Sequence, residues 1–242
     1  MNKIIHFDEI TSTNDYLKDN YNKLPNYTIC YADYQTKGRG RTNRKWQANK
    51  GDNITMSVLI NDKQLIESVS FIPCITLQIA VSVHKVLSQY VSNLKIKWPN
   101  DLLVDGKKLC GILTEGISTS NCIEAIISGI GINVNQENFV EELINNTTSV
   151  CIETNKKFEI KDLIVELSKK ITDDLNSFFL NNYSSIDYLK EHLFGINEMV
   201  SFYRNNEIET GTIIDVNNDG SLKLNVNGKN IDVESGEIKI IR

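Results

Sequence analysis

The chain has 242 residues, with 26 basic and 31 acidic side chains and a formal net charge of −5. This length allows one sizeable domain and a small second one to bury a core without disulfides or metals. The acidic balance argues against a nucleic-acid partner, because the molecule as a whole would repel a polyphosphate.

The cysteine pattern indicates a reducing compartment. Five cysteines are spread along the chain without a C-x-x-C pair: Cys30, Cys74, Cys110, Cys122 and Cys151. We interpret them as reduced thiols in the core. The N-terminus lacks the apolar stretch of a signal peptide, and no run approaches the roughly 18 apolar residues of a membrane span. The sequence therefore predicts a cytoplasmic protein with no membrane partner.

The first part of the chain predicts short strands around one helix and one long loop. Strands are predicted at Ile4–Phe7 and Thr28–Tyr34, and a helix at Ser12–Asn20 that begins like a capping box. The polar stretch Lys37–Asp52 has no hydrophobic period and predicts a long loop, a class that is usually functional or disordered. Asn53–Ile60 has the pattern of a further strand.

The central part predicts two long helices with strands between them. Apolar residues recur at helical spacing over Ile72–Tyr90 and again over Ile160–Phe178. Between them, Leu94–Trp98 alternates with a period of two, and strands are predicted at Leu109–Glu115 and Ile123–Ile130. Because strands come first and helices are grouped, the pattern favours an α+β fold, a mixed β-sheet backed by helices.

The pattern of apolar residues changes near Gly195 from helical spacing to short alternating runs, after a short predicted helix at Ile186–Leu193. Residues Met199–Ile241 predict three or four short strands. Hairpin turn signals separate them at Asn205-Asn206, Asn217–Gly220 and Asn227-Gly228. A segment of this size buries little by itself, so we predict a main domain over residues 1–194 and a small β-barrel over 195–242 that leans on it.

The segment Gly38–Trp46 carries a chemical signal within the long loop. Its glycines let the backbone approach a ligand, and Arg39, Arg41 and Arg44 supply planar donors for carboxylate and phosphate oxygens. Alternatives to an anion-binding loop are a solvated surface loop and an arm for the DNA minor groove. The acidic total charge and the lack of another basic cluster argue against the DNA alternative.

A second candidate site lies where the strand Leu94–Trp98 ends. Lys97 is on the polar face of that strand, and Asn100 and Asp101 follow in a turn. A solvated strand face is the ordinary explanation of such a lysine. Because the turn brings a cation, an amide and a carboxylate together, the segment also predicts a site for a phosphate or carboxylate, a nucleotide or a metal.

Two further motifs have an ordinary structural explanation. Ser12–Asn14 fits a helix N-cap, although the free N–H groups and hydroxyls there can also bind a small polar ligand. The run Gly129–Asn133 suggests a dinucleotide fingerprint, but the third glycine is missing and the run lies inside a β segment. We therefore reject a Rossmann fold.

Taken in chain order, these segments resemble the motifs of one family, the biotin–protein ligases. The segments that carry the resemblance are Ser12–Asn14, Gln35 with the Gly-Arg-Gly-Arg run, Lys97–Leu102, Gly111–Leu113 and Gly129–Asn133. The Lys-Trp-Pro-Asn-Asp string behind an arginine loop is highly specific, and the similarity extends from about Thr11 to Gly236–Ile238. Two positions depart from the family pattern. Thr42-Asn43 stand where relatives often have Arg-Gly, and Asp52-Asn53 follow Gly51 where relatives commonly have a different polar pair. These departures concern how stiff the loop is and not the chemistry.

The resemblance implies a catalytic domain related to class II aminoacyl-tRNA synthetases with an SH3-like C-terminal β-barrel. It implies biotin contacts from Ser12, Thr13, Asn14, Gln35, Arg39, Gly40, Arg41, Lys97, Gly111 and Leu113. It implies nucleotide contacts from Arg41, Arg44, Trp46, Asn100 and Asn133. Lys97, Arg39 and Arg41 would be the catalytic cations. No metal ligands are predicted.

The implied activity is that of a biotin–[acetyl-CoA-carboxylase] ligase. Biotin and ATP would form biotinyl-5′-AMP with Mg²⁺, and biotin would pass to a lysine of a biotin carboxyl carrier protein or domain. Because the Ser-Thr-Asn motif begins at Ser12, we expect no N-terminal DNA-binding domain, and a monomer or homodimer. The alternatives are a lipoate or octanoate ligase or transferase of the same fold, and a regulator that binds biotinyl adenylate without transfer.

Overall fold

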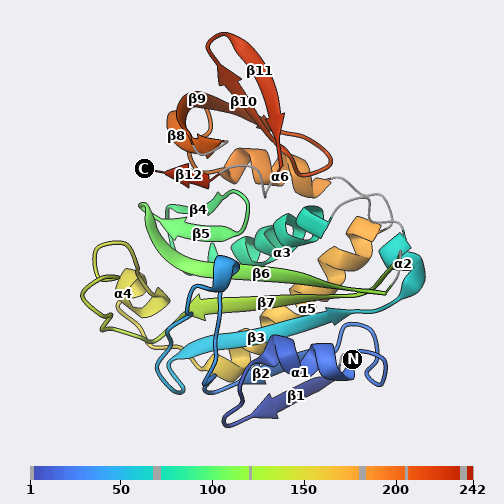
Figure 1. Cartoon of the computed structure of the whole chain (residues 1–242). Helices are drawn as coiled ribbons and strands as arrows, with labels where there is room; N and C mark the ends of the chain where they lie inside the picture. The colour runs from blue at the N-terminus through green and yellow to red at the C-terminus, as the bar shows by residue number, and fades with distance from the viewer. Residues whose placement is uncertain are drawn as a thin grey trace.

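The chain forms two β-sheets and the helices that cover them (Figure 1). The computed structural model describes residues 3–67, 72–119, 122–179, 184–204, 207–234 and 239–241. The predicted α+β class, a mixed sheet backed by helices, is confirmed. No helix among the described residues is long and apolar enough to span a membrane.

The larger sheet has seven strands in the order β1-β2-β3-β7-β6-β5-β4. Their bounds are β1 (Ile4–Phe7), β2 (Ile29–Ala32), β3 (Asn53–Ile60), β4 (Leu94–Lys97), β5 (Asp101–Val104), β6 (Lys107–Thr119) and β7 (Cys122–Asn133). β1 and β2 pair in parallel, and the other neighbours pair antiparallel. Every residue of β3 is buried, because this strand lies in the interior of the sheet with α1 on one face and α5 on the other.

Helices cover the two faces of this sheet unequally. The long helices α3 (Ile72–Leu87) and α5 (Ile160–Phe179) pack on each other and on one face, while α1 (Thr13–Asn20) covers part of the other face (Figure 1). Side chains alternate along β7: Ile126 belongs to the large core under α3 and α5, and Ile127 to a smaller cluster under α1. The remainder of the α1 face is open for a site.

Several short elements were not predicted from the sequence. They are η1 (Arg41–Asn43), α2 (Lys63–Glu67), α4 (Val150–Thr154) and β5. The three helical elements are too short to show a full hydrophobic period, and β5 (DLLV) does not alternate, so the pattern carried no signal for them. The predicted helix near residue 186 is α6 (Ser184–His192).

The second sheet contains five strands in the order β11-β10-β9-β8-β12, more than the three or four that were predicted. Their bounds are β8 (Met199–Arg204), β9 (Glu207–Val216), β10 (Leu222–Val226), β11 (Lys229–Val233) and β12 (Lys239–Ile241). The turn at Asn227-Gly228 is confirmed, with φ of +51° and +81°. The predicted turn at Asn205-Asn206 and the matching segment Gly236–Ile238 lie outside the described residues.

The small sheet contacts the rest of the chain through the residue after β4 and through α6, and the predicted boundary between residues 194 and 195 stays a prediction. The indole Nε1 of Trp98 donates a 2.9 Å hydrogen bond to the carbonyl of Gly220, in the turn between β9 and β10. Lys190 of α6 forms an ion pair of 3.0 Å with Asp215 of β9.

All five cysteines are free. Four of them are buried, as predicted, and burial raises the pKa of Cys30 to about 12. The prediction of a core position is wrong for Cys122, which is exposed. It is the first residue of β7, and its side chain faces solvent.

Candidate functional site

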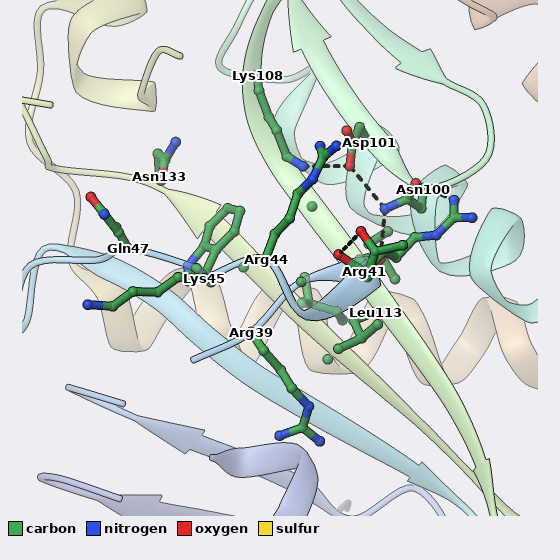
Figure 2. Close-up of a pocket in the computed structure, with 18 of the residues that line it drawn as sticks. Arg39, Arg41, Arg44, Lys45, Gln47, Asn100, Asp101, Lys108, Leu113 and Asn133 are labelled. Carbon is green, nitrogen blue, oxygen red and sulfur yellow. Dashed lines mark hydrogen bonds and ion pairs between the residues drawn. The ribbon is translucent and has the colours of Figure 1, made fainter. Parts of the chain in front are cut away.

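A cavity of about 650 Å³ opens on the face of the large sheet that carries α1 (Figure 2). Every residue that the sequence analysis assigned to biotin or to the nucleotide lines it. These residues are Ser12, Thr13, Asn14, Gln35, Arg39, Gly40, Arg41, Arg44, Trp46, Lys97, Asn100, Gly111, Leu113 and Asn133. Segments far apart in the sequence thus meet at one place, and the roles given to the individual residues stay predictions.

The start of α1 forms one end of the cavity through buried polar contacts. Ser12 caps the helix, since its Oγ accepts a 3.3 Å hydrogen bond from the backbone N–H of Asp15. The backbone N–H of Thr13 donates to Gln35 Oε1 at 2.8 Å, and Asn14 Oδ1 accepts from the hydroxyl of Ser57 at 2.6 Å. These groups have their hydrogen-bond partners within the protein, which fixes their orientation around a ligand.

Glycines on the central strands form the floor of the cavity. A Cβ at Gly129 would lie 2.5 Å from Asn14 Oδ1, and a Cβ at Gly131 would lie 2.5 Å from the ring of Trp46. Both glycines are on the same face of β7, two residues apart. The Gly-x-Gly run therefore lets the end of α1 and the indole approach the strand closely; it has no role in a dinucleotide fold.

The predicted long loop over Lys37–Asp52 is confirmed, since it joins β2 to β3 without a strand or an α-helix, and within it Gly38–Trp46 forms a short hairpin. Trp46 N–H donates to the carbonyl of Gly38 at 3.0 Å, and Gly40 N–H donates to the carbonyl of Arg44 at 2.7 Å. η1 forms the tip, where Thr42 has a φ of +53°. Backbone hydrogen bonds hold this hairpin without an apolar face of its own. Its polar sequence therefore shows no hydrophobic period.

The arginines of this hairpin point in different directions. Figure 2 shows Arg39 extending away from Arg41 and Arg44. Its guanidinium donates to both carboxylate oxygens of Asp15, at 2.6 and 2.8 Å, and to Glu115 Oε2 at 3.2 Å. Arg41 Nη1 instead donates to Asn100 Oδ1 at 3.0 Å, at the opposite end of the cavity.

Cations gather at the end of the cavity that faces the hairpin tip. Lys108 Nζ lies 2.8 Å from Asp101 Oδ1 and 5.8 Å from the ring centroid of Trp46. Burial lowers the pKa of Arg41, and the carboxylate of Asp101 partly opposes that shift. Lys97, at the end of β4, also lines the cavity. A phosphate bound here would meet several cations in a partly desolvated place.

Lys108 is a cavity residue that the sequence analysis missed. Simple alternation along β6 puts Lys108 on the face opposite Gly111. However, the pairing of β5 with β6 shifts register between Leu102 and Leu103, which leaves Leu109 as an extra residue in β6. This bulge turns Lys108 into the cavity, where a Cβ on Gly111 would be 2.9 Å from its Nζ. No signal in the sequence marks the bulge.

Asp15 and Glu115 were also missed as members of the site. Asp15 was interpreted only as part of a capping box, but its carboxylate turns to Arg39. Glu115 was only the end of a predicted strand, and its carboxylate accepts from Asn14 at 2.7 Å and from Lys18 at 2.6 Å. These pairs join residues far apart in the chain, so spacing could not reveal them.

Comparisons with known proteins agree with this geometry. The Biotin/lipoate A/B protein ligase family matches residues 6–133. The bifunctional ligase/repressor BirA of Bacillus subtilis is 30% identical over 223 residues, which cover 90% of this chain and 68% of that protein. The biotin–[acetyl-CoA-carboxylase] ligase of Mycobacterium tuberculosis is 27% identical over 221 residues, 88% of this chain and 79% of that protein.

The fold also matches a solved structure over its whole length. The structure of biotin protein ligase from Aquifex aeolicus in complex with biotin and ATP has a TM-score of 0.88 and 27% identity, and the match covers 100% of both chains. The sequence match, the shared fold and the cavity lined by the matching motifs lead to one conclusion: this chain belongs to the biotin/lipoate A/B protein ligase family.

Proposed function

We propose that the protein is an ATP-dependent biotin–protein ligase. It forms biotinyl-5′-AMP from biotin and ATP and transfers biotin to a lysine of a biotin carboxyl carrier protein or domain. The cavity carries this proposal, because one end offers uncharged hydrogen-bonding groups and the other offers Arg41, Arg44 and Lys108. The names of the relatives, and the biotin and ATP of the Aquifex complex, support the same substrates.

The two ends suit the two parts of a biotinyl adenylate. The α1 end, with Ser12–Asn14 and Gln35, holds the polar ring of biotin through groups whose own hydrogen bonds fix their direction. The cationic end receives the carboxylate and the α-phosphate. The adenine lies beside Trp46 and Asn133, since an indole offers a flat surface for stacking.

In the first step, an oxygen of the biotin carboxylate attacks the α-phosphorus of ATP. The bond from that phosphorus to the bridging oxygen of the β-phosphate breaks, and pyrophosphate leaves with the electron pair. No side chain of the protein acts as a nucleophile. The cations Arg41, Lys97 and Lys108 hold the two anions together and stabilise the charge that develops on the phosphoryl oxygens.

In the second step, the neutral amine of the acceptor lysine attacks the carbonyl carbon of the mixed anhydride. An amide bond forms, the bond from the carbonyl carbon to the phosphate oxygen breaks, and AMP leaves as the amine loses a proton. The hairpin Gly38–Trp46 lies over the cavity and limits the access of water to the anhydride before the lysine arrives.

Mg²⁺ is expected on the phosphates of ATP, where it neutralises charge on the leaving group. Among the described residues that line the cavity, Asp101 is the carboxylate that fits this role, and its Oδ1 already accepts from Lys108. The fit is therefore to an ion held mainly by the phosphates. His6, Asp8 and Asp33 also lie close enough together to hold a metal, but they do not line the cavity.

A direct assay tests the proposal. The protein is incubated with ATP, Mg²⁺, labelled biotin and a biotin carboxyl carrier domain, and both pyrophosphate and label on the carrier are measured. We expect label on a carrier lysine and pyrophosphate release that depends on biotin. Equal turnover with lipoate or octanoate would instead assign the protein to another branch of the family. Pyrophosphate release without label on the carrier would indicate a regulator that keeps the adenylate.

A further inference from the structure

We propose that Arg39 is a positioning residue and not a catalytic cation. In this proposal its ion pairs with Asp15 and Glu115 hold the hairpin Gly38–Trp46 against α1 and thereby shape the biotin end of the cavity. The part of the proposal that concerns biotin binding rests on the proposed function. It revises the role that the sequence analysis gave to Arg39, which was contact with the carboxylate and phosphate.

The geometry of Arg39 favours this role. The guanidinium forms a two-pronged contact with Asp15, with Nη1 to Oδ2 at 2.8 Å and Nη2 to Oδ1 at 2.6 Å. Nη2 also lies 3.2 and 3.4 Å from the two carboxylate oxygens of Glu115. A planar fork with two carboxylates around it is held in one orientation, and Figure 2 shows it directed away from Arg41 and Arg44.

The charges of this cluster balance. Asp15 and Glu115 are negative and Arg39 and Lys18 are positive, with the Lys18–Glu115 pair at 2.6 Å. The hydrogen bonds from Arg39 keep the pKa of Asp15 below its usual range. Burial raises the pKa of Glu115, but the contacts with Lys18, Asn14 and Arg39 outweigh it and lower the pKa overall. Arg39 therefore offers little uncompensated charge to a phosphate.

The cluster also connects three parts of the site mechanically. The backbone of Arg39 pairs with Lys45 across the hairpin, so a fixed Arg39 side chain fixes the base of that hairpin. Glu115 accepts from Asn14 Nδ2 at 2.7 Å, next to the buried contact between Asn14 and Ser57. Loss of the cluster would loosen the hairpin and let Asn14 turn, which would weaken biotin binding without removing a group from the phosphate.

A double-mutant cycle tests the proposal through biotin kinetics. We expect Arg39→Ala and Asp15→Asn each to raise the KM for biotin about tenfold, the scale of a lost charge-assisted contact, with kcat and the KM for ATP changed less than about threefold. The double variant should resemble Arg39→Ala, because that variant has already lost the contact with Asp15. Arg39→Lys should not restore the KM, since a lysine cannot form the fork.

Hydrogen exchange on the ligand-free protein gives a readout that needs no activity. The amides of Gly40 and Trp46, which donate within the hairpin, should exchange faster in both single variants. Lys37→Ala is the matched control, because it removes an exposed cation beside the same hairpin and should leave exchange and KM unchanged. This readout keeps its meaning even if wild-type protein releases no pyrophosphate with biotin, a result that would overturn only the proposed function.

Two results would overturn the positioning role. One is a fall of kcat by about 10²-fold in Arg39→Ala that Arg39→Lys restores, which is the behaviour of a cation on the transition state. The other is an Asp15→Asn variant with normal exchange in the hairpin and a normal or lower KM for biotin. That result would mean that the ion pair competes with the ligand for Arg39.

Discussion

At the α1 end of the cavity, two acidic and two basic side chains neutralise one another, and buried amides and hydroxyls bind among themselves. At the other end, Arg41, Arg44 and Lys108 face Asp101, the acidic group among the described lining residues. The first arrangement suits an uncharged ring that the protein recognises through hydrogen bonds of fixed direction. The second suits a step in which negative charge develops on a phosphate, because cations stabilise that charge more strongly in a partly desolvated place than in water.

The largest effect that separates the two ends is expected at Lys108. Lys108→Ala should slow pyrophosphate release about 10²-fold or more, because it removes a cation from the developing phosphoryl charge. Lys107→Ala is the control, since this neighbour on β6 is exposed and does not line the cavity. Stopped-flow measurement of adenylate formation checks the pair. Near-normal rates of pyrophosphate release in Lys108→Ala would show that the reacting phosphate does not bind at the end of the cavity that holds Lys108.

Acid should weaken the fold through a buried histidine, His84. Burial lowers the pKa of His84 from its ordinary value of 6.5 to about 4. The unfolded chain therefore binds a proton between about pH 6.5 and pH 4 that the folded protein does not. This contribution to the free energy of unfolding is fully present above pH 6.5 and falls by about 3 kcal/mol as the pH drops through this window.

Chemical denaturation across this pH range, on the wild type and on His84→Gln, tests the expectation. The variant should lose most of the pH dependence, since glutamine does not titrate. His6→Gln, at an exposed position, serves as the control and should keep most of it. Equal slopes for wild type and His84→Gln would contradict the assignment.

Two glycines on β7 allow the ends to be disturbed one at a time. Gly129→Ala pushes on Asn14 and should raise the KM for biotin about tenfold, because even a small group in a tight contact forces a shift. Gly131→Ala pushes on the ring of Trp46 and should raise the KM for ATP by a similar factor. Steady-state kinetics with each substrate varied in turn gives the answer. If both variants affect the same substrate, the two ends do not bind different substrates.

The smallest effect is expected at the rim of the neutral end. Lys18→Met removes an ion pair with Glu115 that is partly open to solvent, and should raise the KM for biotin about two- to fivefold. Lys23→Met is the matched control, because Lys23 is an exposed cation that follows the same helix. A tenfold or greater effect at Lys18 would mean that the cluster depends on Lys18 more than on Arg39.

Much of the fold was predictable from local pattern. The helices α3 and α5 show apolar residues at helical spacing over several turns, and β2, β3, β6 and β7 coincide with runs of strand-like residues. The turn at Asn227-Gly228 follows from residues that accept positive φ. These features depend on neighbours in the chain, so a single sequence contains the information for them.

The motifs also predicted the position of the cavity, because residues of every predicted site segment line it, on one face of the large sheet. Sequence alone therefore indicates which groups are present and which strand or helix carries them. Backbone pattern and residue chemistry are local properties, and they do not depend on which strand becomes the partner.

The directions of the charged side chains depend on contacts made in the folded protein. The bulge at Leu109 turns Lys108 into the cavity, and the approach of α1 to β6 gives Arg39 its carboxylate partners, Asp15 and Glu115. An arginine between glycines can meet either a ligand or a protein carboxylate, and the choice depends on groups far away in sequence. Coulomb energy falls with distance in space, not along the chain, so these partners emerge only when the sheet and helix are assembled.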